Sequence, residues 1–469
     1  MIKQFLQLWW RRVVPSAVLM TCAASLPADA AAPQPGQFVR IAPQVAGVLY
    51  RPEASAAHAD IAVVVMHDYN DFLDHPATRN LPARGYTVLA ANPRYAPDLD
   101  DRDTYWDIAL ADLGAAVRHA RSMPGIRKVV LLGHSSGAAL AAAYQNIAEN
   151  GVSACQGPEK IVPCPSALAG LPKADGVVLL DPILGLGANV LTSMDPALAT
   201  GADAGSLDLL APANGFSPKG ASYTPEFRRR FLEVQAQRNA QVLRRAMDRM
   251  AVLKSGNGDF QDDEPFVVPG ATRTPRLWRP DLSLLSHTKQ AHLLLAGDGS
   301  ERTEVVHSMR VPSGLTRTIA DRNDREAARP AEANSMPRPE VRPLLSGGSL
   351  DTTVRRYLST FATRSLPDYD VTESDITGID WNSSYNSVPG NLEGVRSPLL
   401  IMGMTGHYWI VSSEIAWRHA VSKDKSLAFV EGATHSFTPC KPCERAPGQF
   451  GDTEKRTFDY VAAWLAARF

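Results

Sequence analysis

The chain of 469 residues is long enough for one large domain or two ordinary ones. Its 48 basic and 49 acidic residues nearly cancel, and hydrophobic residues make up 45% of the total. This composition is typical of a globular protein, and the sequence shows no basic stripe of the kind that binds nucleic acid. We therefore expect a globular fold and exclude nucleic acid as a partner.

Residues 1–30 have the three parts of a secretory signal peptide: a positive start, an apolar run and a small-residue cleavage site. The apolar run, residues 13–26, is too short to span a membrane, and Pro15 interrupts it. We expect cleavage after Ala30 and export to the periplasm or the medium, with no stable membrane anchor afterwards. The charged residues and the cleavage site are Lys3, Arg11, Arg12 and Ala28-Asp29-Ala30.

Cleavage there would leave four cysteines in two close pairs, Cys155 with Cys164 and Cys440 with Cys443. An even number of cysteines in an oxidising compartment indicates two disulfide bonds. Pairing within each close pair is the simplest of three possible arrangements. The second pair also has the spacing of a redox dithiol or of half a zinc site, although no thioredoxin-like pattern surrounds it.

Short apolar runs rich in β-branched residues recur along the chain, as in IAVVVM at residues 61–66. Such runs are typical of strands buried on both faces of a parallel sheet. Helical patterns alternate with them, which indicates a doubly wound, mostly parallel α/β sheet. The predicted strands are residues 44–50, 61–66, 87–91, 128–132, 176–180, 398–402 and 426–430, and the predicted helices are residues 76–85, 104–121, 138–148, 412–421 and 453–469.

Residues 183–397 break this alternation. We interpret them as a large lid or cap inserted between two parts of one core, residues 31–182 and 398–469; a separate domain with its own function is the alternative. Within the insertion, the patterns predict a long Arg-rich helix at 224–253, an accessory hairpin at 292–296 and 305–311, a mobile loop at 329–342 and a helix at 349–364.

The pentapeptide Gly133-His134-Ser135-Ser136-Gly137 follows one predicted strand and precedes an alanine-rich helix. A serine on such a turn has a strained backbone, and the flanking glycines remove Cβ atoms that would clash there. The amide of Ser136 and the start of the helix then face any negative charge that develops at Ser135. The pattern therefore predicts that Ser135 is a nucleophile.

Ser135 needs a base within hydrogen-bond reach. His435 is the best candidate among eleven histidines, because it follows the last predicted strand and the carboxyl ends of parallel strands meet at one edge of the sheet. His67 is a second candidate, but its place after an early strand better suits a loop that binds an oxyanion. His134 cannot easily turn back to the neighbouring hydroxyl, so we interpret it as structural.

These motifs resemble the α/β-hydrolase family over residues 45–180 and 397–469. In that family the nucleophile, the acid and the histidine follow in this chain order, which matches Ser135 and His435. The resemblance implies an oxyanion hole made by the amides of Ser136 and Tyr69. The chain departs from the family at Asp68, where many members carry glycine.

The acid has two candidates. Most family members carry it shortly after the strand at 398–402, but here the first carboxylate beyond that strand is Glu414. Asp181 ends the strand at 176–180, a position that resembles the acid position of platelet-activating-factor acetylhydrolases and chlorophyllases. We favour Asp181 as the acid, and we expect His407, together with His67, to contact the substrate.

The resemblance implies a serine hydrolase that cleaves a carboxylic ester, lactone or thioester through an acyl-enzyme, without a metal or a cofactor. The small-molecule substrate would be ester-like. An acyltransferase on the same site and a catalytically inactive binding protein of the same fold are the alternatives. The missing carboxylate after residues 398–402 is the feature that favours the inactive protein.

Overall fold

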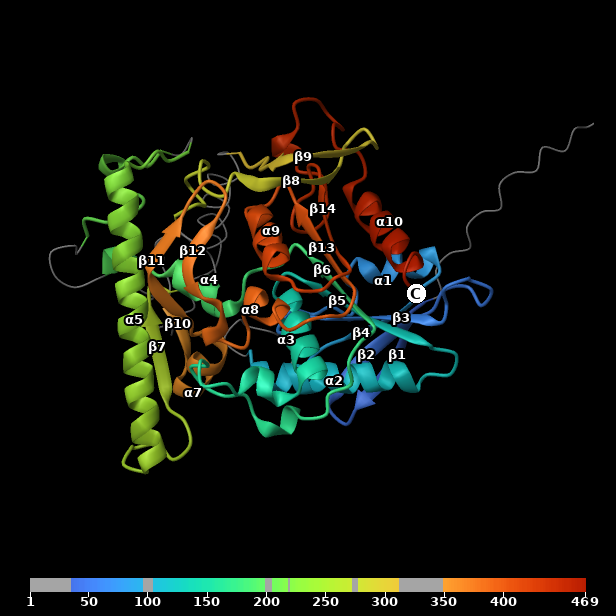
Figure 1. Ribbon diagram of the computed structural model, residues 1–469, viewed down its shortest axis with the longest axis horizontal. Coiled ribbons are helices and arrows are strands. Elements are labelled where there is room, and N and C mark those ends of the chain that lie inside the picture. Colours follow the sequence, from blue (N-terminus) through green and yellow to red (C-terminus); the bar gives the residue numbers. More distant parts are fainter. Residues whose placement is uncertain (1–34, 96–103, 199–204, 218–219, 272–276, 312–348) are drawn as a thin grey trace, which may run out of the picture. The chain divides into compact units, whose positions relative to one another are not determined.

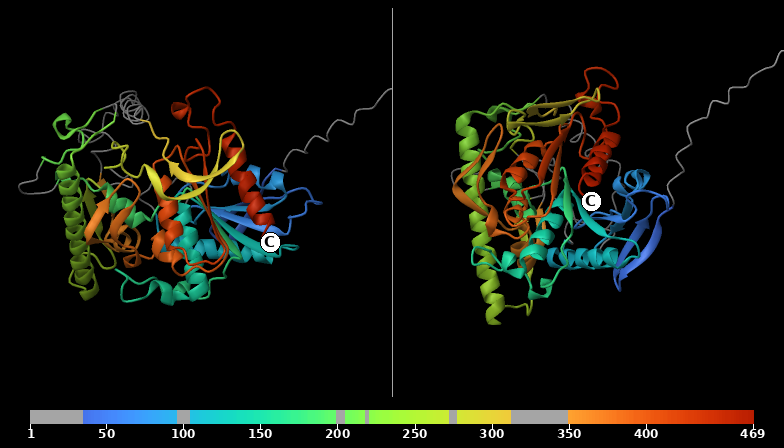
Figure 2. Two further views of the ribbon diagram at one scale, coloured as in Figure 1. Left: turned by 45° about the horizontal axis from the view of Figure 1, so that its top comes forward. Right: turned by 45° about the vertical axis from the view of Figure 1, so that its right-hand side comes forward.

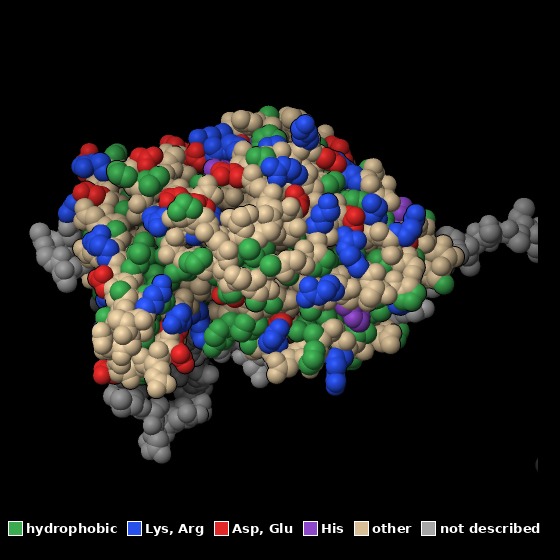
Figure 3. Space-filling view, turned by 60° about the horizontal axis from the view of Figure 1, so that its bottom comes forward, with side chains coloured by type: hydrophobic (Ala, Val, Ile, Leu, Met, Phe, Trp, Pro, Cys, Tyr) green, Lys and Arg blue, Asp and Glu red, His purple; other side chains and the backbone are tan. Residues whose placement is uncertain are grey.

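A computed structural model describes residues 35–95, 104–198, 205–217, 220–271, 277–311 and 349–469. The predicted signal peptide and the loop predicted at 329–342 lie outside these residues. Within the described ranges, every helix is too short or too polar to cross a membrane. On the face shown in Figure 3, basic and acidic side chains are interspersed.

A ten-stranded sheet lies at the centre of the described structure (Figure 1). Its strands are β1 (Gln37–Ala42), β2 (Val45–Tyr50), β3 (Ile61–Met66), β4 (Thr87–Ala91), β5 (Lys128–His134), β6 (Gly176–Leu180), β8 (His287–Leu295), β9 (Glu301–His307), β13 (Leu399–Met404) and β14 (Lys425–Val430). They lie in the order β1-β2-β4-β3-β5-β6-β13-β14-β8-β9. The strands from β4 to β8 in this order are parallel, and β1, β2 and β9 are antiparallel to their neighbours.

This arrangement confirms the predicted fold class, a doubly wound and mostly parallel α/β sheet of the α/β-hydrolase type. Each of the seven strands predicted for the core forms within two residues of its expected ends, whereas the two hairpin strands, β8 and β9, begin five and four residues earlier than expected. The edge strand β1 was not predicted, because its residues are partly or fully exposed and lack a continuous apolar run.

Alternate residues of the central strands face two hydrophobic cores. The helices beside the sheet are α1 (Ala77–Asn80), α2 (Trp106–Ser122), α3 (Ser136–Asn150), α9 (Ile410–His419) and α10 (Thr453–Ala466). In β3, Val64 packs in the core that contains α2, α3 and α9, whereas Val63 and Val65 pack in the core that contains α1 and α10. The helices therefore cover both faces of the sheet (Figure 1), which is why β3 is apolar without interruption.

The insertion contributes a second group of elements. These are α4 (Leu186–Ser193), α5 (Pro225–Ser255), β7 (Pro265–Pro269), β10 (Ser349–Thr353), α7 (Val354–Arg356), β11 (Arg364–Val371), β12 (Ile376–Asp380) and α8 (Val388–Leu392). The predicted Arg-rich helix is α5, which Thr224 caps by accepting a hydrogen bond from the Phe227 amide. Figures 1 and 2 show α5 along β11, where Gln235 accepts a hydrogen bond from Tyr369 at 2.9 Å.

Part of the insertion belongs to the central sheet and to its hydrophobic core. The predicted accessory hairpin forms as β8 and β9, but β8 pairs in parallel with β14 and so extends the central sheet. Apolar residues of α5 also belong to the same core as residues of α3. This shared core argues against a separate domain, while a lid role for the rest of the insertion stays a prediction.

The helix predicted at residues 349–364 is wrong over its first five residues. Residues 349–353 form β10, which pairs with β7 through its β-branched Thr352 and Thr353. Helical structure begins only at Val354, where the Thr353 hydroxyl accepts a hydrogen bond from the Arg356 amide. Pairing with a distant strand therefore overrides the local helical pattern.

The four described cysteines form two disulfide bonds, Cys155–Cys164 and Cys440–Cys443. This is the local pairing that the sequence favours. Cys440 lies beside the loop after β13, because a Cβ atom added to Gly406 would lie 2.9 Å from the Cys440 Cβ atom.

The two-core arrangement predicts which leucines stabilise the fold. Leu400 in β13 is fully buried, whereas Leu366 in β11 is 43% exposed. We expect Leu400→Ala to lower the free energy of unfolding by about 2–5 kcal/mol, because it removes buried methyl groups and leaves a cavity. The matched control Leu366→Ala should change it by less than about 0.5 kcal/mol. Urea denaturation measures both values, and equal losses would contradict the assigned core.

Candidate active site

Ser135 lies on the sharp turn between β5 and α3. Its backbone angles are φ 60° and ψ −125°, a region that residues other than glycine rarely adopt. Its amide donates to the Leu180 carbonyl at 3.1 Å, which fixes the turn beside the end of β6. The serine is partly exposed, whereas the flanking His134 and Ser136 are buried. The turn therefore presents Ser135 above a rigid sheet.

The two glycines of the pentapeptide are needed for close backbone packing. A Cβ atom on Gly133 would lie 2.3 Å from the Gly137 carbonyl oxygen, and one on Gly137 would lie 2.7 Å from the Met66 carbonyl oxygen. Neither backbone oxygen could move without disturbing a strand or the helix start. The spacing of the motif thus follows from how tightly α3 returns onto the sheet.

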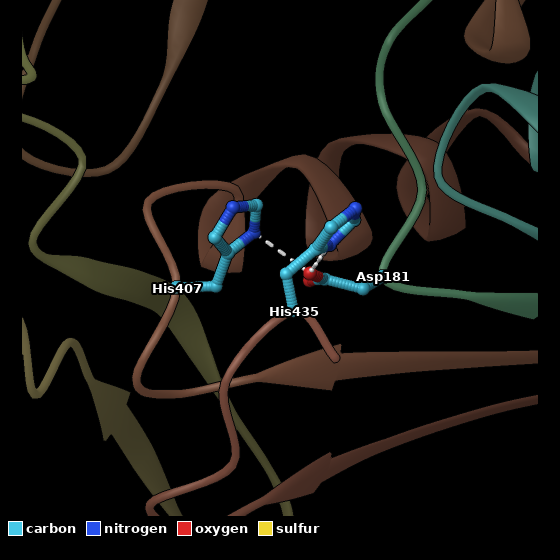
Figure 4. A group of neighbouring side chains, drawn as sticks. All are labelled: Asp181, His407 and His435. Carbon is cyan, nitrogen blue, oxygen red and sulfur yellow. Dashed lines mark hydrogen bonds and ion pairs between the residues drawn. The ribbon is translucent and has the colours of Figure 1, made fainter. Parts of the chain in front are cut away.

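Asp181 and His435 meet at the carboxyl edge of the sheet. Asp181 directly follows β6 and is fully buried, and His435 lies on the loop after β14 with 31% of its side chain exposed. His435 Nδ1 lies 2.5 Å from Asp181 Oδ2, within hydrogen-bond distance (Figure 4). This contact leaves Nε2 as the imidazole nitrogen that is not bound to Asp181.

His407 approaches the same carboxylate oxygen from the loop after β13. Its Nδ1 lies 2.7 Å from Asp181 Oδ2, a short contact that lacks the angles of a hydrogen bond. Its ring stacks on that of His435, with centroids 4.3 Å apart. Figure 4 shows both imidazoles on the one carboxylate. His407 was expected to contact the substrate, and its contact with Asp181 was not predicted.

Burial and charge set the protonation of this group. Burial lowers the pKa of His407 to about 4, so its imidazole is neutral at pH 7. Burial alone would raise the pKa of Asp181, but the contacts with His407 and His435 outweigh it and hold that pKa below its ordinary value. Asp181 is therefore an ionised carboxylate that can stabilise a positive charge on His435.

Glu414, the alternative acid, has other partners. It lies buried on α9 and accepts hydrogen bonds from the amides of Lys289 and Gln290 at 2.8 and 2.9 Å. Its third partner is His292 Nε2, 2.8 Å away. The structure therefore binds Glu414 to β8 and does not bring it to His435.

The loop after β3 differs from what we expected. The amide of Tyr69 donates to His67 Nδ1 at 3.1 Å, and the amide of Asn70 donates to the same nitrogen at 3.0 Å. The Tyr69 amide is thus engaged within its own loop, and its expected part in an oxyanion hole stays a prediction. His67 is fully buried, and its expected contact with the substrate stays a prediction.

Sequence reasoning missed a buried network that joins this loop to the serine turn. Because His67 Nδ1 accepts two amides, the proton lies on Nε2, which donates to the Ser136 hydroxyl at 2.9 Å. The Ser136 hydroxyl in turn donates to the Asp68 carboxylate. The presence of Asp68 in place of glycine was the available signal, and the network gives it a positioning role.

His134 is structural, in agreement with the prediction. Its Nδ1 lies 3.2 Å from His75 Nε2, and the His75 Nδ1 accepts the Ala77 amide at 3.1 Å. Burial lowers the pKa of His75 to about 3 and also lowers the pKa of His134 well below its ordinary value. The centroid of the His134 ring lies 4.5 Å from that of the His435 ring, so the two rings pack against each other.

Asp181, His407 and His435 also form a group that could hold a metal ion. Their ligand atoms all lie within 4.8 Å of one another. A carboxylate and two imidazoles are accepted ligands of Zn²⁺. We predicted no metal from the sequence, and that expectation stays a prediction.

No family model matches the chain, and no curated protein matches it. Among solved structures, a hypothetical protein from Pseudomonas aeruginosa is 14% identical with a TM-score of 0.41, over 97% of this chain and all of that chain. The α/β hydrolase GrgF from Penicillium sp. sh18 is 12% identical with a TM-score of 0.40, over 93% of this chain and 99% of that chain. The siderophore hydrolase EstB from Aspergillus fumigatus is 11% identical with a TM-score of 0.40, over 93% of this chain and 98% of that chain.

Matches with identities and TM-scores this low carry no argument about this chain. The fold class therefore rests on the strand order described above. Similarity to platelet-activating-factor acetylhydrolases at Asp181 stays a prediction.

The buried neutral histidines predict a pH dependence of stability. In the unfolded chain, His407 takes up a proton near the ordinary imidazole pKa of 6.5, whereas in the folded protein burial lowers its pKa to about 4. Between these values the unfolded state binds more protons, so stability falls as the pH falls. We expect His407→Gln to reduce this slope by about one proton, or about 1.4 kcal/mol per pH unit.

Urea denaturation at several pH values between about 4.5 and 6.5 measures how the free energy of unfolding changes with pH. This range lies between the folded and unfolded pKa values of His407. His307→Gln, which changes an exposed histidine of β9, is the matched control. An unchanged slope in the His407 variant would mean that His407 is charged in the folded protein.

Proposed function

We propose that the protein is an exported serine hydrolase that cleaves carboxylic esters, lactones or thioesters through an acyl-enzyme on Ser135. The observation that carries the proposal is the position of Ser135 at a strained strand-to-helix turn, next to the strand whose end supplies Asp181 for His435. A strained serine beside an aspartate–histidine pair is the arrangement that activates a hydroxyl for nucleophilic attack.

In this mechanism His435 removes the proton from the Ser135 hydroxyl as its oxygen attacks the substrate carbonyl. Asp181 holds the His435 ring by Nδ1 and stabilises the imidazolium that forms. His435 then gives the proton to the leaving group, and an acyl-enzyme remains. Water, activated in the same way by His435, releases the acid and restores Ser135.

The negative oxygen of the tetrahedral intermediate needs donors. The first amides of a helix have no partner within that helix, and Ser136 is the first residue of α3. Its amide therefore serves as one donor, helped by the positive end of the helix dipole. The hydrogen bonds among His67, Asp68 and Ser136 join the loop after β3 to the serine turn. The Tyr69 amide is the proposed second donor, and it would have to leave His67 Nδ1 to bind the oxyanion.

Export is part of the proposal. The signal-peptide pattern at residues 1–30 supports it, and so do two disulfide bonds that persist in an oxidising compartment. The contact of Asp181 with His435 supplies a carboxylate that the loop after β13 lacks, and this supports an active hydrolase over the inactive binding protein. Nothing in the site favours an alcohol over water as the acceptor, so hydrolysis is the simpler proposal.

Labelling tests the nucleophile. A fluorophosphonate probe should react with the wild type and leave Ser135→Ala unlabelled, because only an activated serine attacks the phosphorus. Ser300→Ala, in the exposed turn between β8 and β9, is the matched control and should label like the wild type. A folded wild type that resists the probe would refute the proposed function.

Substitution of the two carboxylates tests the acid. Asp181→Asn should lower kcat by roughly 10⁴-fold, because the amide favours the wrong tautomer of His435. Glu414→Gln should keep most of its kcat per folded molecule, since Glu414 contacts β8 and not His435. Hydrolysis of 4-nitrophenyl acetate measures both, with circular dichroism to quantify folded protein. The reverse result would assign the acid to Glu414.

A further inference from the structure

A pocket of about 310 Å³ opens beside the candidate active site, and His407 forms part of its wall. Two arginines, Arg279 and Arg310, line it together with Tyr408 and the disulfide bond between Cys440 and Cys443. The remaining described residues of its wall are apolar or glycine, and none of the lining residues is acidic. Arg279 and Arg310 therefore give this wall a positive charge.

Arg310 is fixed in place by neutral acceptors. Its guanidinium donates to the carbonyls of Trp278 and Leu284 at 2.8 and 2.6 Å, and its Nε donates to the Ser308 hydroxyl at 3.0 Å. Burial lowers its pKa to about 10, a value at which it still carries its charge at pH 7. Carbonyl dipoles orient this cation without neutralising it.

Asp281 is the acidic group whose charge acts on Arg310, and it has a closer partner. Its carboxylate lies 2.6 Å from the Arg228 guanidinium and also accepts from the Ser283 hydroxyl at 2.7 Å. It does not line the pocket. The positive charge of Arg310 is therefore only partly compensated by Asp281.

Arg279 lies against the ring of Tyr408. Its guanidinium carbon is 5.0 Å from the centroid of that ring, a cation–π contact. In the described part of the chain it forms no ion pair with a carboxylate. Because Arg279 is partly exposed, its fork of N–H donors is open to a group that enters the pocket.

A row of rings in contact connects Arg279 to the proposed catalytic histidine. The Tyr408 ring lies 4.2 Å from the His407 ring, which lies 4.3 Å from the His435 ring. The backbone is tied as well, because the Met309 amide, one residue before Arg310, donates to the Thr405 carbonyl at 2.7 Å. The pocket and the active site therefore share one wall.

We propose that this pocket binds an anionic group of the substrate, so that the preferred esters carry a carboxylate or a phosphate on the part that extends past His407. The inference rests on the proposed hydrolase function. Two guanidinium groups without an acidic neighbour in the wall favour an anion that both can bind through charge-assisted hydrogen bonds. The apolar part of the wall, which includes Leu282 and Val311, suits the short carbon chain that carries such a group.

Matched pairs of esters test the proposal. 4-Nitrophenyl hydrogen succinate and 4-nitrophenyl methyl succinate differ by one charge on the acyl side, and 4-acetoxybenzoate and its methyl ester differ by one charge on the alcohol side. For at least one pair, the wild type should prefer the charged ester by about 10-fold or more in kcat/KM, the value of one hydrogen bond to a charged group. Arg279→Gln should lower that preference about 10-fold, whereas the charge-matched control Arg244→Gln, an exposed arginine of α5, should keep it.

Binding of the free anions provides a readout that does not depend on catalysis. Calorimetric titration of the wild type with succinate and with inorganic phosphate should detect one of the two, and Arg279→Gln should weaken it about 10-fold. The tighter anion identifies the group that the pocket prefers. Should Arg279→Gln misfold, Arg279→Lys, which keeps the charge but loses the planar fork, gives the same comparison.

The outcomes separate the two proposals. Hydrolysis of the neutral esters that depends on Ser135, with no preference for charge and no anion binding, overturns the anionic pocket and leaves the hydrolase intact. Absence of any hydrolysis refutes the hydrolase, and in that case anion binding that depends on Arg279 still supports the pocket as a binding site.

Discussion

The geometry of the candidate active site depends on one buried carboxylate oxygen, Asp181 Oδ2. Asp181 Oδ2 has two imidazole nitrogens within 2.7 Å, while Oδ1 accepts a hydrogen bond from the Met404 amide at 3.4 Å. An ionised carboxylate with no exposure to water is stable only when such partners replace its hydration. The same partners fix the His435 ring, since Nδ1 must face Asp181. Because the buried charge of Asp181 needs a partner, Nδ1 of His435 faces Asp181. Nε2, on the other side of the ring, is left for the proposed role as base.

The position of Asp181 affects the neighbouring loops, after β5 and β13, at the carboxyl edge of the sheet. β5 and β6 are neighbours, so the turn with Ser135 and the end of β6 are linked directly by the hydrogen bond from the Ser135 amide to Leu180. The loop after β13, which need not supply an acid, can carry His407 instead. Burial lowers the pKa of His407 and holds it neutral, so it adds a contact to Asp181 without competing for its charge. In the proposed triad the acid follows β6 instead of β13, and the loop after β13 carries a second imidazole.

The sequence was sufficient for features that local patterns determine. Buried strands show as apolar runs, the Gly-x-Ser-x-Gly turn shows as spacing, and Asp181 and His435 stand out because each follows such a strand. Features that need distant partners were not predictable. The contact of His407 with Asp181, the network of His67 with Ser136, and the pairing of β8 with β14 each join residues far apart in the chain. The hydrogen bond from the Tyr69 amide to the His67 ring was not predictable either, because it depends on the position of a side chain.

The pairing of β8 with β14 also explains how the insertion reaches the proposed site. β14 leads to His435, and its neighbour β8 turns back through β9 toward Arg310. The segment after β9 is then bound to the loop of His407 through the Met309 amide. Because the sheet is rigid, the insertion can place charged side chains beside His407 with the accuracy of a strand and not of a free loop. The strands and turns of the core would then supply the reacting groups, and a two-strand extension of the same sheet would supply the groups that select the substrate.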